Sequence, residues 1–315
     1  MLQKQQKSCG LPWRFNWLRA GAGKSEWRRS RRVDVKIVVT GGSGRLGRYL
    51  LSELAQHGHD VTVCDLVPPE GEYRFLRADV LNLGALDWAF AGAEGVVHLA
   101  AIPHPLEDAP DQVFAVNTQG TFNVLEAAAR AGVRRVAIAS SDSALGFGFR
   151  QRDFGPDYLP LDEDHPRYPQ DPYSLSKAFA EDLAAAFTRR SGLQTICLRP
   201  CWIWFPERDE GYRAAVDDPR LHWKGLWVYV DARDVARAFR LAVEAPDLPD
   251  HSVCYVSAAD LAAREETLTL IDRFYPGVPR VDRAHLAGHR SVINGRRAER
   301  LLGFRPQYSW RDWIR

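Results

Sequence analysis

Short runs of β-branched and other apolar residues alternate along the chain with longer stretches in which apolar residues recur at helical spacing. The apolar runs are typical of strands buried on both faces, and their alternation with helices predicts βαβ units and a parallel sheet. We therefore expect an α/β protein with a doubly wound, Rossmann-type parallel sheet. The expected strands cover 35–40, 61–64, 96–100, 136–139 and 195–198, with a further short strand before residue 79. The expected helices cover 45–57, 83–91, 113–131 and 172–190.

The regular pattern ends after Arg199-Pro200. Residues 201–225 are rich in Trp, Asp, Pro and Arg, which predicts loops with short elements. Beyond them we expect strands over 226–230 and 253–257, and helices over 234–244 and 295–302. The pattern thus predicts a Rossmann domain over 35–200. Residues 201–315 are expected to form mainly a small substrate lobe, except that 226–245 pack back on the Rossmann domain.

The first 34 residues differ in charge from the rest of the chain. The formal net charge is +2, but residues 1–34 hold nine Lys or Arg and only two acidic residues, so the remainder is net negative. A basic segment that carries Trp13, Trp17 and Trp27 is one way to bind nucleic acid, because tryptophans stack on bases. A disordered or misassigned leader is the simpler interpretation, and we do not expect a nucleic-acid partner.

Cysteine usage and hydropathy indicate the compartment. The five cysteines are odd in number and contain no Cys-x-x-Cys pair, which is typical of reduced thiols rather than of a disulfide scaffold or a zinc site. No apolar run reaches the length of about 18 residues that a membrane helix needs. We therefore expect a cytoplasmic protein without a metal and without a membrane partner.

A glycine-rich loop follows the first expected strand, where residues 40–47 read TGGSGRLG. Gly41, Gly44 and Gly47 permit a tight turn and let backbone N–H groups approach a pyrophosphate. The helix that begins here adds its positive N-terminal end. With a strand before it and a helix after it, the loop, including Arg45 and Leu46, predicts a dinucleotide site.

Asp65 ends the second expected strand, 18 residues after Gly47. A carboxylate at that place holds both ribose hydroxyls and repels a 2′-phosphate, which favours NAD over NADP. Arg45 argues the other way, since a guanidinium in the loop can meet such a phosphate. Asp79 and Val80 follow the third short strand and are candidates for contact with the adenine edge, although a plain loop aspartate explains Asp79 nearly as well.

A second group of polar residues suggests catalysis. Tyr173 and Lys177 stand four residues apart at the start of an expected helix, so they share one face of it. To act as a base near neutrality, the tyrosine needs a pKa well below its ordinary value of about 10, and a neighbouring ammonium favours the phenolate. Ser141 follows the strand at 136–139, at the edge of the sheet where open α/β folds bind ligands.

Taken in order, these motifs resemble the extended short-chain dehydrogenase/reductase family, the NAD-dependent epimerase/dehydratase group. The resemblance implies that Tyr173 is the acid/base, that Lys177 binds the nicotinamide ribose and lowers the pKa of Tyr173, and that Ser141 polarises the reacting C–O group. Together with the residues already named, the segments that carry it are HLAA (98–101), VNTQGTFNVLEAA (116–128), ASS (139–141), YSLSK (173–177), LRP (198–200), VYVDARDVARA (228–238) and LLGFRP (301–306).

The same resemblance implies further contacts and a partner. Leu99, Ala100 and Ala101 are expected beside the cofactor, and Asn117 is expected either beneath the site or as a buried structural residue. Family members often pair through the helices that correspond to 111–131 and 172–190, so a homodimer is implied.

Departures from the family pattern narrow the substrate. Trp202 lies in the segment where sugar-nucleotide members commonly carry an asparagine for a nucleotide phosphate. Asp142 is followed by Ser143 instead of the glutamate of sugar-nucleotide dehydratases, which disfavours dehydration. The short C-terminal part resembles members that oxidise a free sugar acid. In that comparison Lys224 or Arg213 is a candidate for a substrate carboxylate, and Trp202, Trp204, Trp223 and Trp227 are candidates either for a sugar ring or for the core.

The sequence leaves three functions open. The first is an NAD-dependent dehydrogenase that oxidises a carbinol carbon of a sugar or sugar-acid-like substrate, with Tyr173 as the base. The second is an epimerase that returns the hydride to the opposite face of the sugar. The third is a non-catalytic NAD-binding regulator, which the presence of Ser141, Tyr173 and Lys177 disfavours.

Overall fold

The computed structural model describes residues 35–207 and 209–314. The predictions for the basic leader at 1–34, with Trp13, Trp17 and Trp27, lie outside the described residues.

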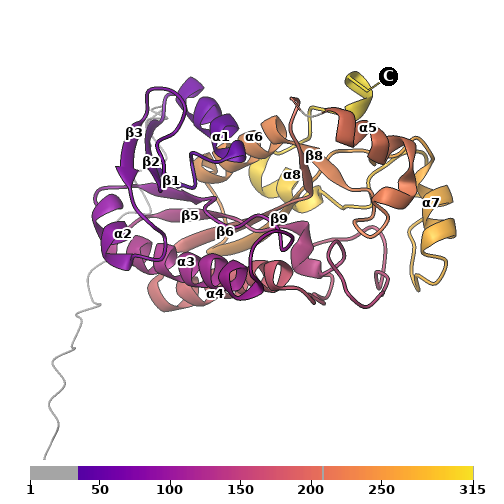
Figure 1. Ribbon diagram of the computed structural model, residues 1–315, viewed down its shortest axis with the longest axis horizontal. Coiled ribbons are helices and arrows are strands. Elements are labelled where there is room, and N and C mark those ends of the chain that lie inside the picture. Colours follow the sequence, from indigo (N-terminus) through magenta and orange to yellow (C-terminus); the bar gives the residue numbers. More distant parts are fainter. Residues whose placement is uncertain (1–34, 208, 315) are drawn as a thin grey trace, which may run out of the picture. The chain divides into compact units, whose positions relative to one another are not determined.

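A seven-stranded parallel sheet forms the centre of the fold, with strand order β3-β2-β1-β4-β5-β6-β9 (Figure 1). The central strands carry side chains such as Val39, Val96 and Val97 that are wholly inaccessible, as expected for a sheet covered on both faces. The predicted Rossmann-type α/β fold is confirmed. The strands are β1 Lys36–Thr40, β2 Asp60–Asp65, β3 Arg74–Arg77, β4 Gly95–His98, β5 Arg135–Ala139, β6 Gln194–Pro200 and β9 His251–Val256.

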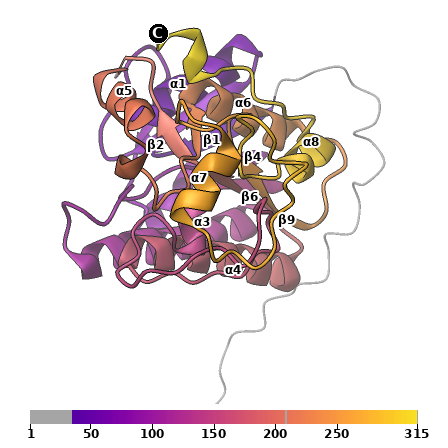
Figure 2. The same ribbon diagram turned by 90° about the vertical axis from the view of Figure 1, so that its right-hand side faces the viewer.

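Helices cover both faces of the sheet. Helices α1 (Arg45–Gln56) and α6 (Ala232–Glu244) pack together on one face, and α2 (Leu83–Ala89), α3 (Pro110–Ala131) and α4 (Pro172–Ser191) lie on the other (Figures 1 and 2). Helix α8 (Arg296–Leu302) packs beside α6 and β9. Because all strands are parallel, their carboxyl ends share one edge, and the loops there hold the predicted site residues.

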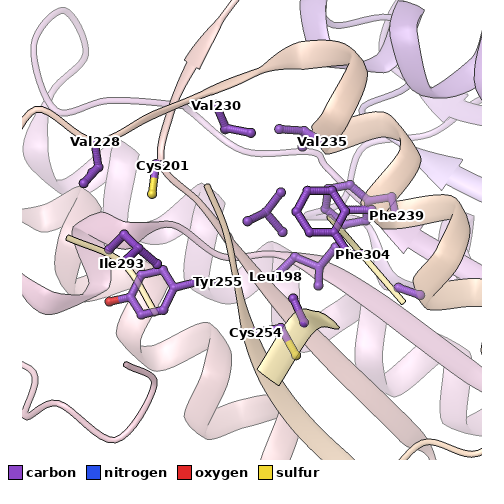
Figure 3. Close-up of a cluster of buried hydrophobic side chains, with 14 of the residues drawn as sticks. Leu198, Cys201, Val228, Val230, Val235, Phe239, Cys254, Tyr255, Ile293 and Phe304 are labelled. Atoms are coloured by element: carbon purple, nitrogen blue, oxygen red, sulfur yellow. The ribbon is translucent and has the colours of Figure 1, made fainter. Parts of the chain in front are cut away.

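A large apolar cluster joins residues from before and after residue 200. Leu198 of β6, Cys254 of β9, Val235 and Phe239 of α6, and Phe304 beyond α8 converge in it (Figure 3). The sheet therefore takes its last strand and part of its cover from the C-terminal half of the chain. The division of the chain into two domains near residue 200 stays a prediction.

The C-terminal part differs locally from the sequence expectation. The strand expected over 226–230 is only β8 (Tyr229–Asp231), because Leu226 and Trp227 both adopt a φ of 55°, which no strand accommodates. The buried Trp227 side chain holds this turn by donating from Nε1 to the Pro219 carbonyl at 2.7 Å. Sequence periodicity also missed β7 (Trp202–Trp204), which pairs with β8, and the helices α5 (Asp209–Asp217) and α7 (Thr267–Phe274).

None of the helices in the described ranges is both long and apolar enough to cross a membrane. Cys64, Cys197, Cys201 and Cys254 are buried with free thiols. Over 35–207 and 209–314, no group of three or more His, Cys, Asp or Glu side chains is arranged to hold a metal ion.

Candidate active site

The glycine loop between β1 and α1 is built from close backbone approaches. Gly41 has a φ of 72°, and a Cβ on it would lie 2.4 Å from the Ala100 nitrogen. A Cβ on Gly47 would lie 2.1 Å from the Gly42 carbonyl oxygen, so the first turn of α1 sits directly on the loop. Only glycine fits at either position.

The N-terminus of α1 is open toward this loop. Gly44 is its N-cap, and among the described residues no side chain caps the first turn. The first-turn N–H groups therefore have the free hydrogen-bonding capacity and the positive end of the helix dipole that a pyrophosphate requires. The loop fits a dinucleotide on this ground.

Asp65 lies at the carboxyl end of β2, beside the glycine loop. Its Oδ2 accepts from the Ser43 N–H at 3.0 Å and its Oδ1 accepts from the Leu66 N–H at 2.6 Å. Each carboxylate oxygen keeps a second lone pair, and the side chain is half-buried, so both oxygens remain able to accept from two neighbouring hydroxyls.

In the structure the Arg45 guanidinium does not extend freely toward the position where a 2′-phosphate of NADP would bind. Its guanidinium stacks over the Phe205 ring, 3.9 Å from the ring centroid. Asp79 is exposed and its Oδ1 accepts from the Leu81 N–H at 2.9 Å, as in an ordinary turn. The buried Val80 carbonyl accepts from Asn123 Nδ2 at 2.9 Å, so it is already used within the protein.

Asn117 is buried and its amide is fully engaged. Its Oδ1 accepts from the Ile102 N–H at 2.8 Å, while Nδ2 donates to the Ile102 carbonyl at 3.0 Å and to Ser176 Oγ at 3.1 Å. These contacts favour the structural alternative for Asn117. They also fix the segment that contains Leu99, Ala100 and Ala101 against the helix that carries Tyr173, and Gly41 abuts the same segment.

The catalytic candidates converge at the carboxyl end of β5. Helix α4 starts there because Asp171 caps it, accepting from the Ser174 N–H at 2.9 Å, and Pro172 occupies its first turn. The side chains of Tyr173 and Ser141 are hydrogen-bonded to each other. Lys177 donates from Nζ to the Ala139 carbonyl at 2.7 Å, and Nζ lies 5.5 Å from the Tyr173 ring centroid. The structure thus brings all three predicted residues together.

The pKa of Tyr173 differs from the sequence expectation. Burial raises it above its ordinary value, the hydrogen bond with Ser141 opposes this rise, and the charges of Asp142 and Asp171 add to it. Burial also lowers the pKa of Lys177 to about 8. The expectation that Lys177, together with a positively charged nicotinamide, makes Tyr173 acidic stays a prediction. In this structure the Lys177 ammonium donates to Ala139, and burial is the largest effect on the Tyr173 pKa.

A buried ion pair lies directly behind these residues. Glu181 follows Lys177 by one helical turn and accepts from Arg199 Nε at 2.7 Å and Arg199 Nη2 at 2.8 Å. Ser140 donates to the same carboxylate at 2.6 Å. The pair therefore ties β5, β6 and α4 together next to Ser141. Sequence analysis missed Glu181, although its spacing of four from Lys177 was an available signal.

Asp142 is the other acidic residue that the sequence did not assign to the site. Its Oδ1 accepts from Ser141 Oγ at 3.1 Å, and Ser143 Oγ lies 3.5 Å from the same oxygen. The residue as a whole is only partly buried. The sequence used Asp142 as a departure from the dehydratase pattern and gave no signal of this contact.

The four tryptophans and Lys224, the other candidates for substrate contact, differ in how deeply they are buried. Trp204 and Trp227 are wholly buried, whereas Trp202 and Trp223 keep part of their surface accessible. Lys224 donates to the Arg150 carbonyl at 3.3 Å and lies 3.8 Å from Asp153, so it is paired within the protein. These contacts favour core packing for two of the four tryptophans and a structural contact for Lys224.

The doubly wound sheet, the uncapped glycine loop and the Ser–Tyr–Lys group define a dinucleotide-dependent enzyme class. Residues 37–216 match the model of the NAD dependent epimerase/dehydratase family, and the chain belongs to that family. The chain is 33% identical over 232 residues to L-arabinose 1-dehydrogenase (NAD(P)(+)) of Haloferax volcanii, covering 71% of this chain and 89% of that protein.

Other relatives agree on the fold and the broad class. A uronate dehydrogenase of Pseudomonas syringae pv. tomato is 27% identical over 224 residues, covering 70% of this chain and 73% of that protein. The solved structure of MoeE5 in complex with UDP-glucose and NAD is 26% identical with a TM-score of 0.68, covering 89% of this chain and 96% of that chain. The uronate dehydrogenase structure from Agrobacterium tumefaciens has a TM-score of 0.63 at 24% identity, covering 88% of this chain and 87% of that chain, and shows the fold alone.

Proposed function

We propose that this protein is an NAD-dependent oxidoreductase that oxidises a carbinol carbon of a sugar or sugar-acid-like substrate. The observation that carries the proposal is the buried, hydrogen-bonded pair of Tyr173 and Ser141, with Lys177 one helical turn along, beside an uncapped glycine loop. Similarity to an arabinose dehydrogenase and a uronate dehydrogenase supports a free sugar or sugar acid as the substrate.

In the proposed reaction Tyr173 takes the proton of the substrate hydroxyl as the C–H hydride leaves the same carbon and a carbonyl forms. NAD supplies the hydride acceptor when bound. Ser141 donates a hydrogen bond to the substrate oxygen and orients it against the phenol. Lys177 keeps two N–H donors beyond its bond to Ala139, and these are available to the nicotinamide ribose. A positively charged nicotinamide, when bound, would oppose the effect of burial on the Tyr173 pKa.

The residues proposed to hold NAD are those of the glycine loop, Gly41, Gly44, Arg45, Leu46 and Gly47. Asp65 is proposed to accept from the two adenosine ribose hydroxyls, which disfavours a 2′-phosphate there. The stacking of Arg45 on Phe205 supports the preference for NAD over NADP. Backbone contacts from Leu99, Ala100 and Ala101, and contacts of Asp79 and Val80 with the adenine, complete the proposed cradle.

The test is incubation with NAD and a panel of free aldoses, uronates and nucleotide sugars, following both NADH absorbance and product identity. The proposal predicts net NADH with a free sugar or sugar acid. Isomerised sugar without net NADH would show the epimerase instead. Binding of NAD without conversion of any sugar would favour the non-catalytic regulator.

We also propose a homodimer through α3 and α4, which pack side by side (Figure 1). Phe122 and Phe179 are 36% and 45% exposed on these helices and would be covered in such a dimer. Light scattering should give the mass of a dimer, and Phe179→Glu should shift it to that of a monomer. The four buried free thiols support a cytoplasmic location, which stays part of this proposal.

A further inference from the structure

Asp142 places a carboxylate one hydroxyl away from the proposed reacting centre. Its Oδ1 is 3.1 Å from Ser141 Oγ, and Ser141 is in turn hydrogen-bonded to Tyr173. Ser141 is 7% exposed and Tyr173 is 8% exposed, while Asp142 is more accessible than either. The carboxylate therefore lies next to the catalytic group and contacts it through the Ser141 hydroxyl.

The groups that surround Asp142 come from the carboxyl ends of three adjacent strands. Burial raises the pKa values of Tyr173, Cys201 and Tyr255, and the charge of Asp142 raises each of them further. Ser141 follows β5, Cys201 follows β6, and Tyr255 lies near the end of β9, and these strands are neighbours in the sheet. Asp142 thus lies near the carboxyl ends of β5, β6 and β9, the edge of the sheet where ligands bind in this class of fold.

The cations near this carboxylate are already paired. Arg199, whose charge acts on Asp142, is held by Glu181 through two hydrogen bonds of 2.7 and 2.8 Å. Lys177 donates to the carbonyl of Ala139, the last residue of β5. Both cations are therefore engaged within the protein, and of their nitrogen atoms only Nη1 of Arg199 is left without a hydrogen-bond partner in the described part of the chain.

We infer that Asp142 selects a neutral sugar over the corresponding sugar acid, by accepting a hydrogen bond from a hydroxyl of the neutral substrate and repelling the carboxylate of the acid. The inference rests on the proposed function and narrows its substrate class from sugars and sugar acids to neutral aldoses. A like charge in a site of reduced dielectric disfavours the acid by about tenfold or more.

The selection depends on pH. Burial raises the pKa of Asp142 to about 6, against hydrogen bonds from Ser141 and Ser143 and the charge of Arg199, which lower it. Sugar acids are ionised throughout the range in which Asp142 titrates. The preference for the neutral sugar therefore grows as the pH rises through about 6 and shrinks below it. Lys177 loses its charge only as the pH approaches about 8, so a change in the ratio centred near pH 6 comes from Asp142 and not from Lys177.

The experiment measures kcat/KM with NAD for matched pairs, D-galactose with D-galacturonate and D-glucose with D-glucuronate, from pH 5 to pH 8. We compare the wild type, Asp142→Asn and, as a matched control, Asp272→Asn, which removes an exposed carboxylate of α7. The wild type should prefer the aldose by about tenfold or more at pH 8 and less at pH 5. Asp142→Asn should reduce the preference at pH 8 by about tenfold and make it independent of pH, while Asp272→Asn should behave as the wild type.

A wild-type preference for the uronate at pH 8, or a ratio that does not change between pH 5 and pH 8, would overturn the inference and leave the proposed oxidation standing. An unchanged ratio in a folded Asp142→Asn variant would do the same. If Asp142→Asn does not fold, the wild-type pH series decides the matter by itself. Absence of NADH with these pairs and with every other sugar of the panel would overturn the proposed function, and this inference with it.

Discussion

The glycine loop and the catalytic group lie along one edge of the same sheet but are held by different forces. The loop depends on close contacts between backbone segments, of Gly41 with Ala100 and of Gly47 with Gly42. Among the described residues no side chain caps helix α1. The catalytic group depends on buried polar side chains that satisfy one another, from Ser141 and Tyr173 through to Glu181. A change in the loop therefore acts through steric overlap, whereas a change in the catalytic group acts through charge and proton position.

The largest expected effect comes from removing the proposed base. Tyr173→Phe should lower kcat by about a thousandfold, because general acid–base catalysis contributes roughly 10² to 10⁴. NAD affinity, measured by titration calorimetry, should stay within about twofold, since the loop is untouched. Tyr168→Phe, which removes the hydroxyl of an exposed tyrosine, should keep wild-type kcat and serves as the control. Equal losses in both variants would sink the assignment.

The next largest effect is a loss of stability when the buried Glu181–Arg199 ion pair is broken. Glu181→Gln leaves the buried Arg199 without its charge partner and should lower the free energy of unfolding by about 3 kcal/mol. Asp182→Asn on the same helix breaks an exposed pair with Arg167 and should cost less than about 1 kcal/mol. Urea unfolding of the two variants checks this contrast, and equal costs would show that Glu181 carries no buried charge.

The glycine loop should respond to a single methyl group. Gly41→Ala adds a Cβ 2.4 Å from the Ala100 nitrogen at a φ of 72°, whereas Gly58→Ala adds one at a φ of 81° into open space. Gly58→Ala should cost about 1 kcal/mol from backbone strain alone. Gly41→Ala should cost about 2 kcal/mol more and should weaken NAD binding, and thermal unfolding with and without NAD measures both. Similar costs at the two positions would mean that the close approach is absent in solution.

The last effect is a pH dependence of stability from Lys177. Burial lowers its pKa to about 8, below the value of about 10.4 expected in the unfolded chain. Below pH 8 the lysine is charged in both states and the full cost of burying it is present; the cost disappears as the pH rises from about 8 to above 10. The stability gain of Lys177→Met over the wild type should therefore be larger at pH 7 than at pH 10.5, by about 3 kcal/mol at most.

The exposed Lys36 provides the control for that series, since Lys36→Met should show no such difference between the two pH values. A gain for Lys177→Met that is the same at pH 7 and pH 10.5 would contradict the assigned pKa.

The regular half of the fold was predictable because its signals are local. The spacing of apolar residues along the chain identifies buried strands and amphipathic helices. A glycine loop between a strand and a helix is likewise recognised from adjacent residues alone. The catalytic group was predictable for the same reason, since Tyr173 and Lys177 share one helical turn. Residues 201–228 were not, because Trp227 holds its left-handed turn through a bond to Pro219 and a buried ring, which are tertiary contacts.

Electrostatics were the least predictable part of the site. The sequence places Lys177 near Tyr173 but does not show that its ammonium bonds Ala139, nor that burial raises the pKa of the phenol. The sequence likewise gives no sign of the contact between Asp142 and Ser141, which only the structure shows.

The most direct test of the account follows a deuterium atom from an aldose labelled at the carbinol carbon to be oxidised. With wild-type protein and NAD, mass spectrometry should find the deuterium in NADH and none in the solvent, while Tyr173→Phe binds NAD but forms almost no labelled NADH. Loss of the label to water, or labelled NADH from Tyr173→Phe at the wild-type rate, would contradict hydride transfer with this phenol as the base.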